Sequence, residues 1–312
     1  MTNQIPQNYQ RSTGWKLLGA GCLTLLSVAG LGGVNGCAAL QHLTERGREF
    51  LNTHGFNELP MQGDTLAAIA LPGSSPSPSS STGANIRWLT VFIEGDGASW
   101  PLPWQPPSDP TPSKPIGMQL AAEHRSSLAQ SVAGRGGAAE EAIAYLGRPC
   151  QYLSADALSR CPLTAWTLGR FGDAPLAQLA AQLDALKART PAAKLRLVGY
   201  SGGGAAAVLL ASDRSDVACL VTVASPLDTD AWTATKQVSR LSQSRNPLDA
   251  AGKLRGLPAT HFAGAQDAVV PSGVNQRFFD ASQSRETRLD GFDHESPWVK
   301  SWPQLARQSC LG

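Results

Sequence analysis

In the second half of the chain, segments with apolar residues at helical spacing alternate with short, continuous apolar runs. The first pattern predicts amphipathic helices and the second predicts buried strands. Because parallel strands need a long crossover between them, strands separated by helical stretches predict a mostly parallel sheet flanked by helices, an α/β fold. The predicted elements are a helix over Leu176–Ala188, a strand over Leu195–Tyr200, a helix over Gly203–Ser212 and strands over Val217–Ala224, Ala259–Gly264 and Thr287–Leu289.

The first half carries weaker patterns. The apolar run Arg87–Glu94 stops at Gly95-Asp96-Gly97, which predicts a buried strand that delivers a loop. Asp64–Leu71 predicts an earlier strand, and the Ser- and Pro-rich stretch Pro72–Gly83 predicts an exposed loop, because it cannot form a core. We find no internal repeat and no second composition regime, so we expect one folded domain over residues 61–312.

The N-terminal segment differs from the rest of the chain. Arg11 and Lys16 precede Leu17–Val34, an apolar run without a charged residue, and this is the layout of a secretion signal. The run ends in Val34-Asn35-Gly36-Cys37, which resembles the lipobox of bacterial lipoproteins, although Asn35 departs from the usual Ala or Ser.

That resemblance implies that Cys37 is lipidated, becomes the new N-terminus and holds the protein on a membrane of the cell envelope, facing the periplasm, with the outer membrane as the expected site. Residues 1–37 would then be signal and anchor. Residues 38–60 would be a tether, within which Gln41–Asn52 is either a polar linker or a short helix. The alternatives are an uncleaved membrane anchor and cleavage elsewhere with full release.

Composition is that of an ordinary globular protein, with 42% hydrophobic and 16% charged residues. Lys and Arg number 26 against 24 Asp and Glu, a formal net charge of +2, which gives no basic field for nucleic acid. The sequence shows no clustered His/Cys spacing for a metal, no dinucleotide fingerprint and no Walker loop, so we expect no metal and no cofactor.

Four cysteines follow Cys37, and an even number fits an oxidising compartment. Cys150 and Cys161 are near in sequence and flank a short polar stretch, so we predict a disulfide between them. Cys219 lies in an apolar run, where a free buried thiol and a bond to Cys310 are both open.

Gly199-Tyr200-Ser201-Gly202-Gly203 satisfies the pattern G-x-S-x-G. A bare match carries little weight in a chain with 31 glycines, but this one follows a predicted strand and opens a predicted helix, as a nucleophile elbow requires. The elbow would expose the Ser201 hydroxyl at the carboxyl edge of the sheet. The backbone N–H of Gly202, at the helix N-terminus, would favour a developing oxyanion.

From this motif onward the chain resembles the α/β-hydrolase superfamily, over about Arg87 to Trp302. The superfamily's triad runs in the order serine, acid, histidine. Ala263-Gly264-Ala265-Gln266-Asp267 follows a strand candidate and looks like the acid loop, so the resemblance implies that Asp267 is the acid. Spacing alone also leaves the acidic residues Asp280, Asp290 and Asp293 open.

Two histidines follow the predicted nucleophile. His261 lies inside a predicted strand, where a core histidine is the better interpretation, whereas His294 lies in a polar turn after the last predicted strand, where the superfamily places its base. His294 would take the proton of Ser201, and Asp267 would fix the tautomer of His294.

The second oxyanion donor should come from the loop Glu94-Gly95-Asp96-Gly97, as the backbone N–H of Asp96 or Gly97. A carboxylate would repel an oxyanion, so we expect the Asp96 side chain to point away and hydrogen-bond the loop, or to contact a polar substrate group. Tryptophans would line or cover the pocket mouth unless they belong to the core, and the candidates are Trp100, Trp104, Trp166, Trp298 and Trp302.

These residues predict a serine hydrolase that cleaves a carboxylic ester or thioester, on a small molecule or a lipid, through an acyl-enzyme on Ser201. The same triad serves amidases, peptidases and acyltransferases, and fold resemblance does not choose among them. From another class, a catalytically silent envelope lipoprotein that binds lipid or protein is the alternative.

Overall fold

The structure is a computed structural model that describes residues 35–72, 86–97, 105–135, 140–191 and 193–312. The predicted signal segment, most of the Ser- and Pro-rich stretch, and the pocket candidates Trp100 and Trp104 lie outside the described residues. Contacts divide the chain into Met1–Asn35 and Gly36–Gly312, and the second unit holds the sheet and its helices.

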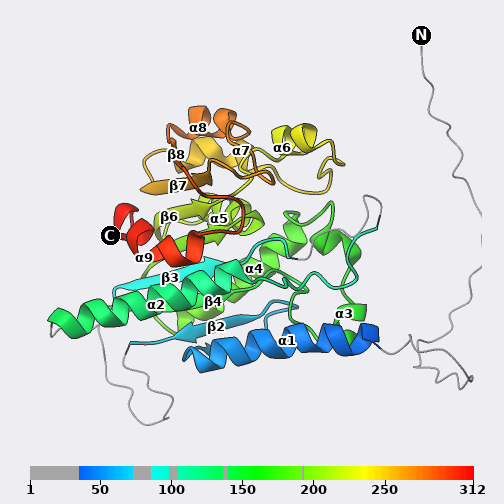
Figure 1. Cartoon of the computed structure of the whole chain (residues 1–312), viewed down its shortest axis with the longest axis horizontal. Coiled ribbons are helices and arrows are strands. Elements are labelled where there is room, and N and C mark those ends of the chain that lie inside the picture. The colour runs from blue at the N-terminus through cyan, green and yellow to red at the C-terminus, as the bar shows by residue number, and fades with distance from the viewer. Residues whose placement is uncertain (1–34, 73–85, 98–104, 136–139, 192) are drawn as a thin grey trace, which may run out of the picture. The chain divides into compact units, whose positions relative to one another are not determined.

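A sheet of eight strands forms the centre of the second unit, in the order β1-β2-β4-β3-β5-β6-β7-β8 (Figure 1). From β4 to β8 every neighbouring pair is parallel, while β2 is antiparallel to both β1 and β4. The prediction of a mostly parallel sheet is therefore confirmed. The strands are β1 Asn57–Glu58, β2 Ala67–Ala70, β3 Trp88–Ile93, β4 Glu141–Leu146, β5 Lys194–Tyr200, β6 Val217–Val223, β7 Ala259–Gly264 and β8 Glu286–Leu289.

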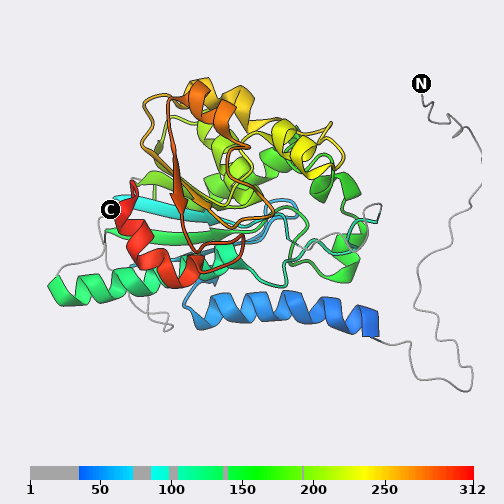
Figure 2. The ribbon, with the colours of Figure 1, turned by 45° about the horizontal axis from the view of Figure 1, so that its top comes forward.

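Helices cover both faces of the sheet because alternate strand residues point to opposite sides. In β3, Leu89, Val91 and Ile93 pack with α4 and α5 on one face, and Phe92 packs with α2 and α9 on the other. Figure 2 shows α9 beside α2 on this second face. The helices are α1 Asn35–Thr53, α2 Ile116–Arg135, α3 Ala155–Ser159, α4 Asp173–Ala188, α5 Gly202–Ser212, α6 Thr229–Lys236, α7 Pro247–Ala250, α8 Gln276–Ser282 and α9 Trp298–Gln308, with 3-10 turns at Leu163–Trp166 and Ala251–Leu254.

The segment Gln41–Asn52, which the sequence predicts to be either a polar linker or a short helix, lies within the 19-residue helix α1. It contacts the rest of its unit, because Leu51 is fully buried and the Thr44 hydroxyl donates to the carbonyl of Leu153 at 3.2 Å. Among the described helices, none is both long and apolar enough to cross a bilayer.

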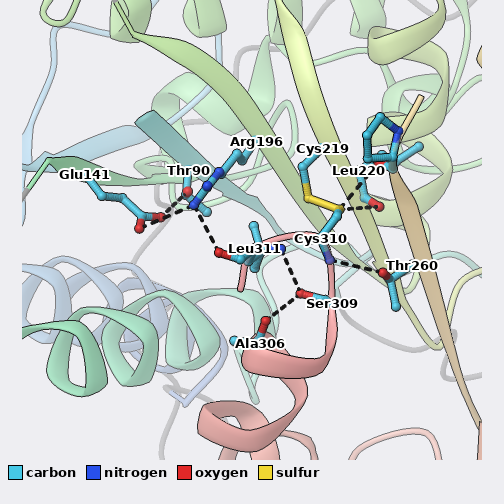
Figure 3. The surroundings of a disulfide bond; sticks show 11 residues. Thr90, Glu141, Arg196, Cys219, Leu220, Thr260, Ala306, Ser309, Cys310 and Leu311 are labelled. Atoms are coloured by element: carbon cyan, nitrogen blue, oxygen red, sulfur yellow. Dashed lines mark hydrogen bonds and ion pairs between the residues drawn. A yellow bond between two sulfur atoms is a disulfide. The ribbon is translucent and has the colours of Figure 1, made fainter. Parts of the chain in front are cut away.

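Two disulfides lie in this unit, one between neighbouring segments and one between segments far apart in the sequence. Cys150 and Cys161 are bonded, as the sequence predicts, and Cys219 is bonded to Cys310, a pairing that the sequence left open. Figure 3 shows the second bond, which ties β6 to the residues that follow α9. Next to it, Arg196 donates to the backbone carbonyl of Leu311 at 3.2 Å, so the C-terminal segment is held to the sheet at two points.

Candidate active site

Ser201 stands at a sharp turn between β5 and α5. Its backbone has φ 51° and ψ −125°, a left-handed conformation that is strained for a residue with a side chain. A Cβ at Gly199 would overlap the backbone of Gly203 and Gly204, and a Cβ at Gly203 would overlap the carbonyl of Ile93. The glycines therefore let the helix start directly against the strands, which is the geometry of a nucleophile elbow.

The three residues of the predicted triad lie in hydrogen-bonding contact. His294 Nε2 is 3.1 Å from Ser201 Oγ, and His294 Nδ1 is 2.8 Å from Asp267 Oδ2. The Asp267 carboxylate is buried, and its other oxygen accepts the backbone N–H groups of Val269 and Val270, each at 2.8 Å. With the carboxylate so fixed, Nδ1 carries the proton and Nε2 is free to accept the proton of the serine.

The loop that carries His294 is held from two sides. The backbone carbonyl of His294 accepts a hydrogen bond from the hydroxyl of Tyr200 at 2.9 Å and one from the indole N–H of Trp298 at 3.0 Å. Burial raises the pKa of Tyr200, so its hydroxyl stays a neutral donor. The alternative acid Asp293 does not reach the ring: its carboxylate accepts the backbone N–H groups of Glu295 and Ser296 within its own turn.

His261 is a core histidine, in agreement with the sequence. Its ring is buried, contacts the rings of Phe278 and Phe279, and shares a hydrogen bond of 2.9 Å with the hydroxyl of Thr222. Burial lowers the pKa of His261 to about 4, because the charged ring would lose its hydration.

The loop after β3 lies against Ser201. The N–H of Gly95 donates to the Glu94 carboxylate at 2.9 Å, whereas the N–H groups of Asp96, Gly97 and Gly202 have no hydrogen-bond partner among the described residues. The Glu94 carboxylate also accepts two N–H groups at the start of α2. Its Oε1 accepts that of Gly117 and its Oε2 accepts that of Met118. Burial raises the pKa of Glu94, although these hydrogen bonds oppose the rise.

The Asp96 side chain binds two arginines that the sequence analysis did not single out. Arg148 Nη1 donates to Oδ1 at 2.9 Å and Arg170 Nη1 to Oδ2 at 2.7 Å. Burial by itself raises the pKa of Asp96, but Arg170 and Arg148 outweigh it and hold that pKa below its ordinary value. The carboxylate also covers Gly202, where a Cβ would overlap it.

A cavity of about 480 Å³ opens beside Ser201 and His294. Trp166 lines it, whereas Trp298 and Trp302 take the alternative that the sequence left open: they belong to the core and are fully buried on α9, because that helix presents them to the sheet. Trp232, which the sequence analysis did not single out, also lines the cavity. The apolar residues on the wall include Ile116, Trp166, Pro226, Trp232, Val269 and Val270, and the charged residues include Asp96, Lys114, Arg170, Asp293 and Glu295.

One group of potential metal ligands occurs within the described residues, formed by Asp64, Cys150 and Cys161. The two cysteines are bonded to each other and therefore offer no thiolate. This group does not support a metal centre.

Comparisons with known proteins agree with this architecture. The sequence matches no protein-family model and no curated protein. Among solved structures, puromycin hydrolase is similar with a TM-score of 0.55 and 17% identity, over 80% of this chain and 37% of that one. Est1E from Butyrivibrio proteoclasticus is similar with a TM-score of 0.53 and 12% identity, over 81% of this chain and 96% of that one. An esterase from Pyrococcus furiosus is similar with a TM-score of 0.53 and 12% identity, over 84% of this chain and 94% of that one.

This chain thus spans well under half the length of puromycin hydrolase but nearly all of the two shorter proteins. Together with the sheet order and the elbow, these likenesses show that the chain has the α/β-hydrolase fold.

Proposed function

We propose that this protein is a serine hydrolase that cleaves a carboxylic ester or thioester through an acyl-enzyme on Ser201. The observation that carries the proposal is the chain of two hydrogen bonds from Asp267 through His294 to Ser201, in a turn that opens into a cavity. A binding protein has no need of this alignment, which supports the enzyme over the silent lipoprotein.

The reaction follows from the contacts. As Ser201 Oγ bonds to the carbonyl carbon, its proton passes to His294 Nε2 and the carbonyl electron pair moves onto the oxygen. The tetrahedral intermediate then collapses: its bond to the alcohol or thiol breaks, and the leaving group takes the proton from His294. Water repeats the two steps on the acyl-enzyme and releases the acid. Asp267 stays ionised throughout and stabilises the charged imidazole.

Mass spectrometry after incubation with a fluorophosphonate tests this proposal. We expect a single adduct on Ser201, absent from Ser201→Ala. The variant Ser212→Ala is a suitable control, because Ser212 lies at the far end of α5 from the elbow. No adduct on the folded wild-type chain would refute the enzyme and favour the binding protein. A matched pair of ester and amide substrates then separates an esterase from an amidase or peptidase.

We further propose that a lipid on Cys37 anchors the protein in the cell envelope. The lipobox-like sequence supports this, and so do the two disulfides, which are typical of oxidising compartments. Growth with an alkyne-tagged fatty acid should label the wild type and Cys22→Ala, but not Cys37→Ala. Equal labelling of all three chains would contradict the assignment.

A further inference from the structure

The backbone N–H of Asp96 is the first free donor of the loop beside Ser201. A Cβ on Gly95 would lie 3.4 Å from the Cβ of Ser201, so the loop passes directly along the nucleophile. The N–H of Gly95 is already used by Glu94, which leaves the next amide, that of Asp96, without a partner among the described residues.

Gln151 fixes the orientation of this amide. Its side chain is fully buried and donates from Nε2 to the carbonyl of Gly95 at 3.0 Å and of Pro110 at 3.3 Å. Its Oε1 accepts the backbone N–H of Arg148 at 3.0 Å. Because a trans peptide is planar, the N–H of Asp96 points away from the carbonyl of Gly95. Holding that carbonyl toward Gln151 therefore aims the N–H to the opposite side.

Arg148 and Arg170 fix the side chain of the same residue and balance its charge. Besides their bonds to Asp96, Arg148 Nη2 donates to the carbonyl of Arg170 at 2.6 Å, and Arg170 Nε donates to the carbonyl of Thr167 at 2.8 Å. The arginine side chains are 5% and 12% exposed. Two cations and one carboxylate leave this cluster with a single positive charge beside Gly202.

We propose that Gln151, Arg148 and Arg170 are positioning residues for an oxyanion hole made by the backbone N–H groups of Asp96 and Gly202. This inference rests on the proposed hydrolase function. The negative charge that forms on the substrate carbonyl oxygen would otherwise meet the Asp96 carboxylate, which lies over Gly202. The two arginines offset the charge of the Asp96 carboxylate before the substrate arrives, so no reorganisation is needed during the reaction.

The test is steady-state hydrolysis of one ester by the full chain and its variants. Arg170→Gln should lower kcat by about 10- to 100-fold with little change in KM, which is less than the roughly 10²- to 10³-fold loss from removing an oxyanion donor itself. Gln151→Met should act in the same direction. The control Arg160→Gln should match the wild type, because Arg160 is exposed and its side chain pairs with Asp156 alone within the described part of the chain.

A double variant in which both charges are neutralised separates this role from a purely structural one. Arg170→Gln leaves Asp96 with one cation, whereas adding Asp96→Asn restores the net positive charge through Arg148. The double variant should therefore be more active than Arg170→Gln, and its inhibition by a trifluoromethyl ketone, which forms a tetrahedral oxyanion, should recover in parallel. A structural role predicts instead that removing a second partner lowers activity further.

Two results would overturn the inference: folded Arg170→Gln with wild-type kcat, or a double variant less active than the single one. Circular dichroism and thermal unfolding of each variant establish that it is folded. If the wild type itself forms no fluorophosphonate adduct, the hydrolase proposal fails and this inference fails with it. An adduct on Ser201 with unaffected variants refutes the inference alone.

Discussion

The Cys219–Cys310 bond closes a much longer stretch of chain than Cys150–Cys161, with sequence separations of 91 and 11 residues. In the chain-entropy model, a cross-link of the first length stabilises a fold by roughly 4–5 kcal/mol and one of the second by roughly 3 kcal/mol, because it restricts the unfolded chain. We predict that replacing Cys219 and Cys310 by alanine lowers the free energy of unfolding more than replacing Cys150 and Cys161.

The loss of kcat should follow the opposite order: it should be larger when Cys150 and Cys161 are replaced than when Cys219 and Cys310 are. Cys219 pairs with Arg196 in the sheet, four residues before Tyr200, and so lies well away from the edge that carries Ser201. Cys150, in contrast, lies between Arg148 and Gln151, which hold the loop of Asp96. The first double variant should keep its kcat, and the second should lose part of it.

Urea denaturation, extrapolated linearly to water, measures the free energy of unfolding, and ester hydrolysis without denaturant measures kcat. Both double variants are compared with the wild type with its disulfides formed. The reasoning is refuted if the shorter loop proves the more stabilising one, or if the folded Cys219→Ala/Cys310→Ala chain loses more than about twofold in kcat.

Three further variants test the site and the core. Asp267→Asn should lower kcat for ester hydrolysis by about 10³- to 10⁴-fold, because the amide favours the wrong tautomer of His294; an unchanged kcat would exclude Asp267 as the acid. Gly202→Ala should lower kcat, because the new Cβ would push away the Asp96 side chain and with it the loop that carries the Asp96 N–H; wild-type turnover would mean that this loop need not hold its position. His261 has a pKa of about 4 in the fold against an ordinary 6.5, so the unfolded chain binds more protons between these values. The free energy of unfolding should therefore fall by roughly 3 kcal/mol as pH drops from 6.5 to 4, and His261→Gln should flatten this part of the urea-denaturation profile.

The elements around the nucleophile could be predicted because their signals are local. β5 and α5 differ from the predicted ranges by one residue each, and the glycines of the turn between them are visible in the sequence as the pattern G-x-S-x-G. Asp267 follows the predicted strand Ala259–Gly264, which the structure has with the same bounds, whereas the strand before His294 is only weakly marked in the sequence, since β8 consists of Glu, Thr, Arg and Leu.

Other parts of the fold depend on packing that a linear pattern does not contain. The sequence does not predict α2 or β4. Apolar and polar residues are mixed around α2, so it has no distinct apolar face, and half of β4 is Ala or Glu, which are depleted in strands. Trp298 and Trp302 carry no sign in the sequence that distinguishes a core position from a pocket wall.

The contacts of Asp96 illustrate why the site could be predicted only in part. Its partners Arg148 and Arg170 lie 52 and 74 residues further along the chain, and neither belongs to a motif. The pairing of Cys219 with Cys310 was equally hidden, since it depends on where the chain runs after α9. A single sequence shows which residues have reactive chemistry, but not which distant charges surround them.

If Cys37 carries a lipid, as we propose, the packing of α1 limits how far the folded unit lies from the membrane. Thr44 already contacts Leu153, and the roughly seven helical residues from Cys37 to Thr44 span about 10 Å. A flexible linker over residues 38–60 would instead reach roughly 26 Å on average. A lipid at Cys37 would therefore keep the folded unit closer to the bilayer than a flexible linker would, so its substrates would have to lie at or near that surface.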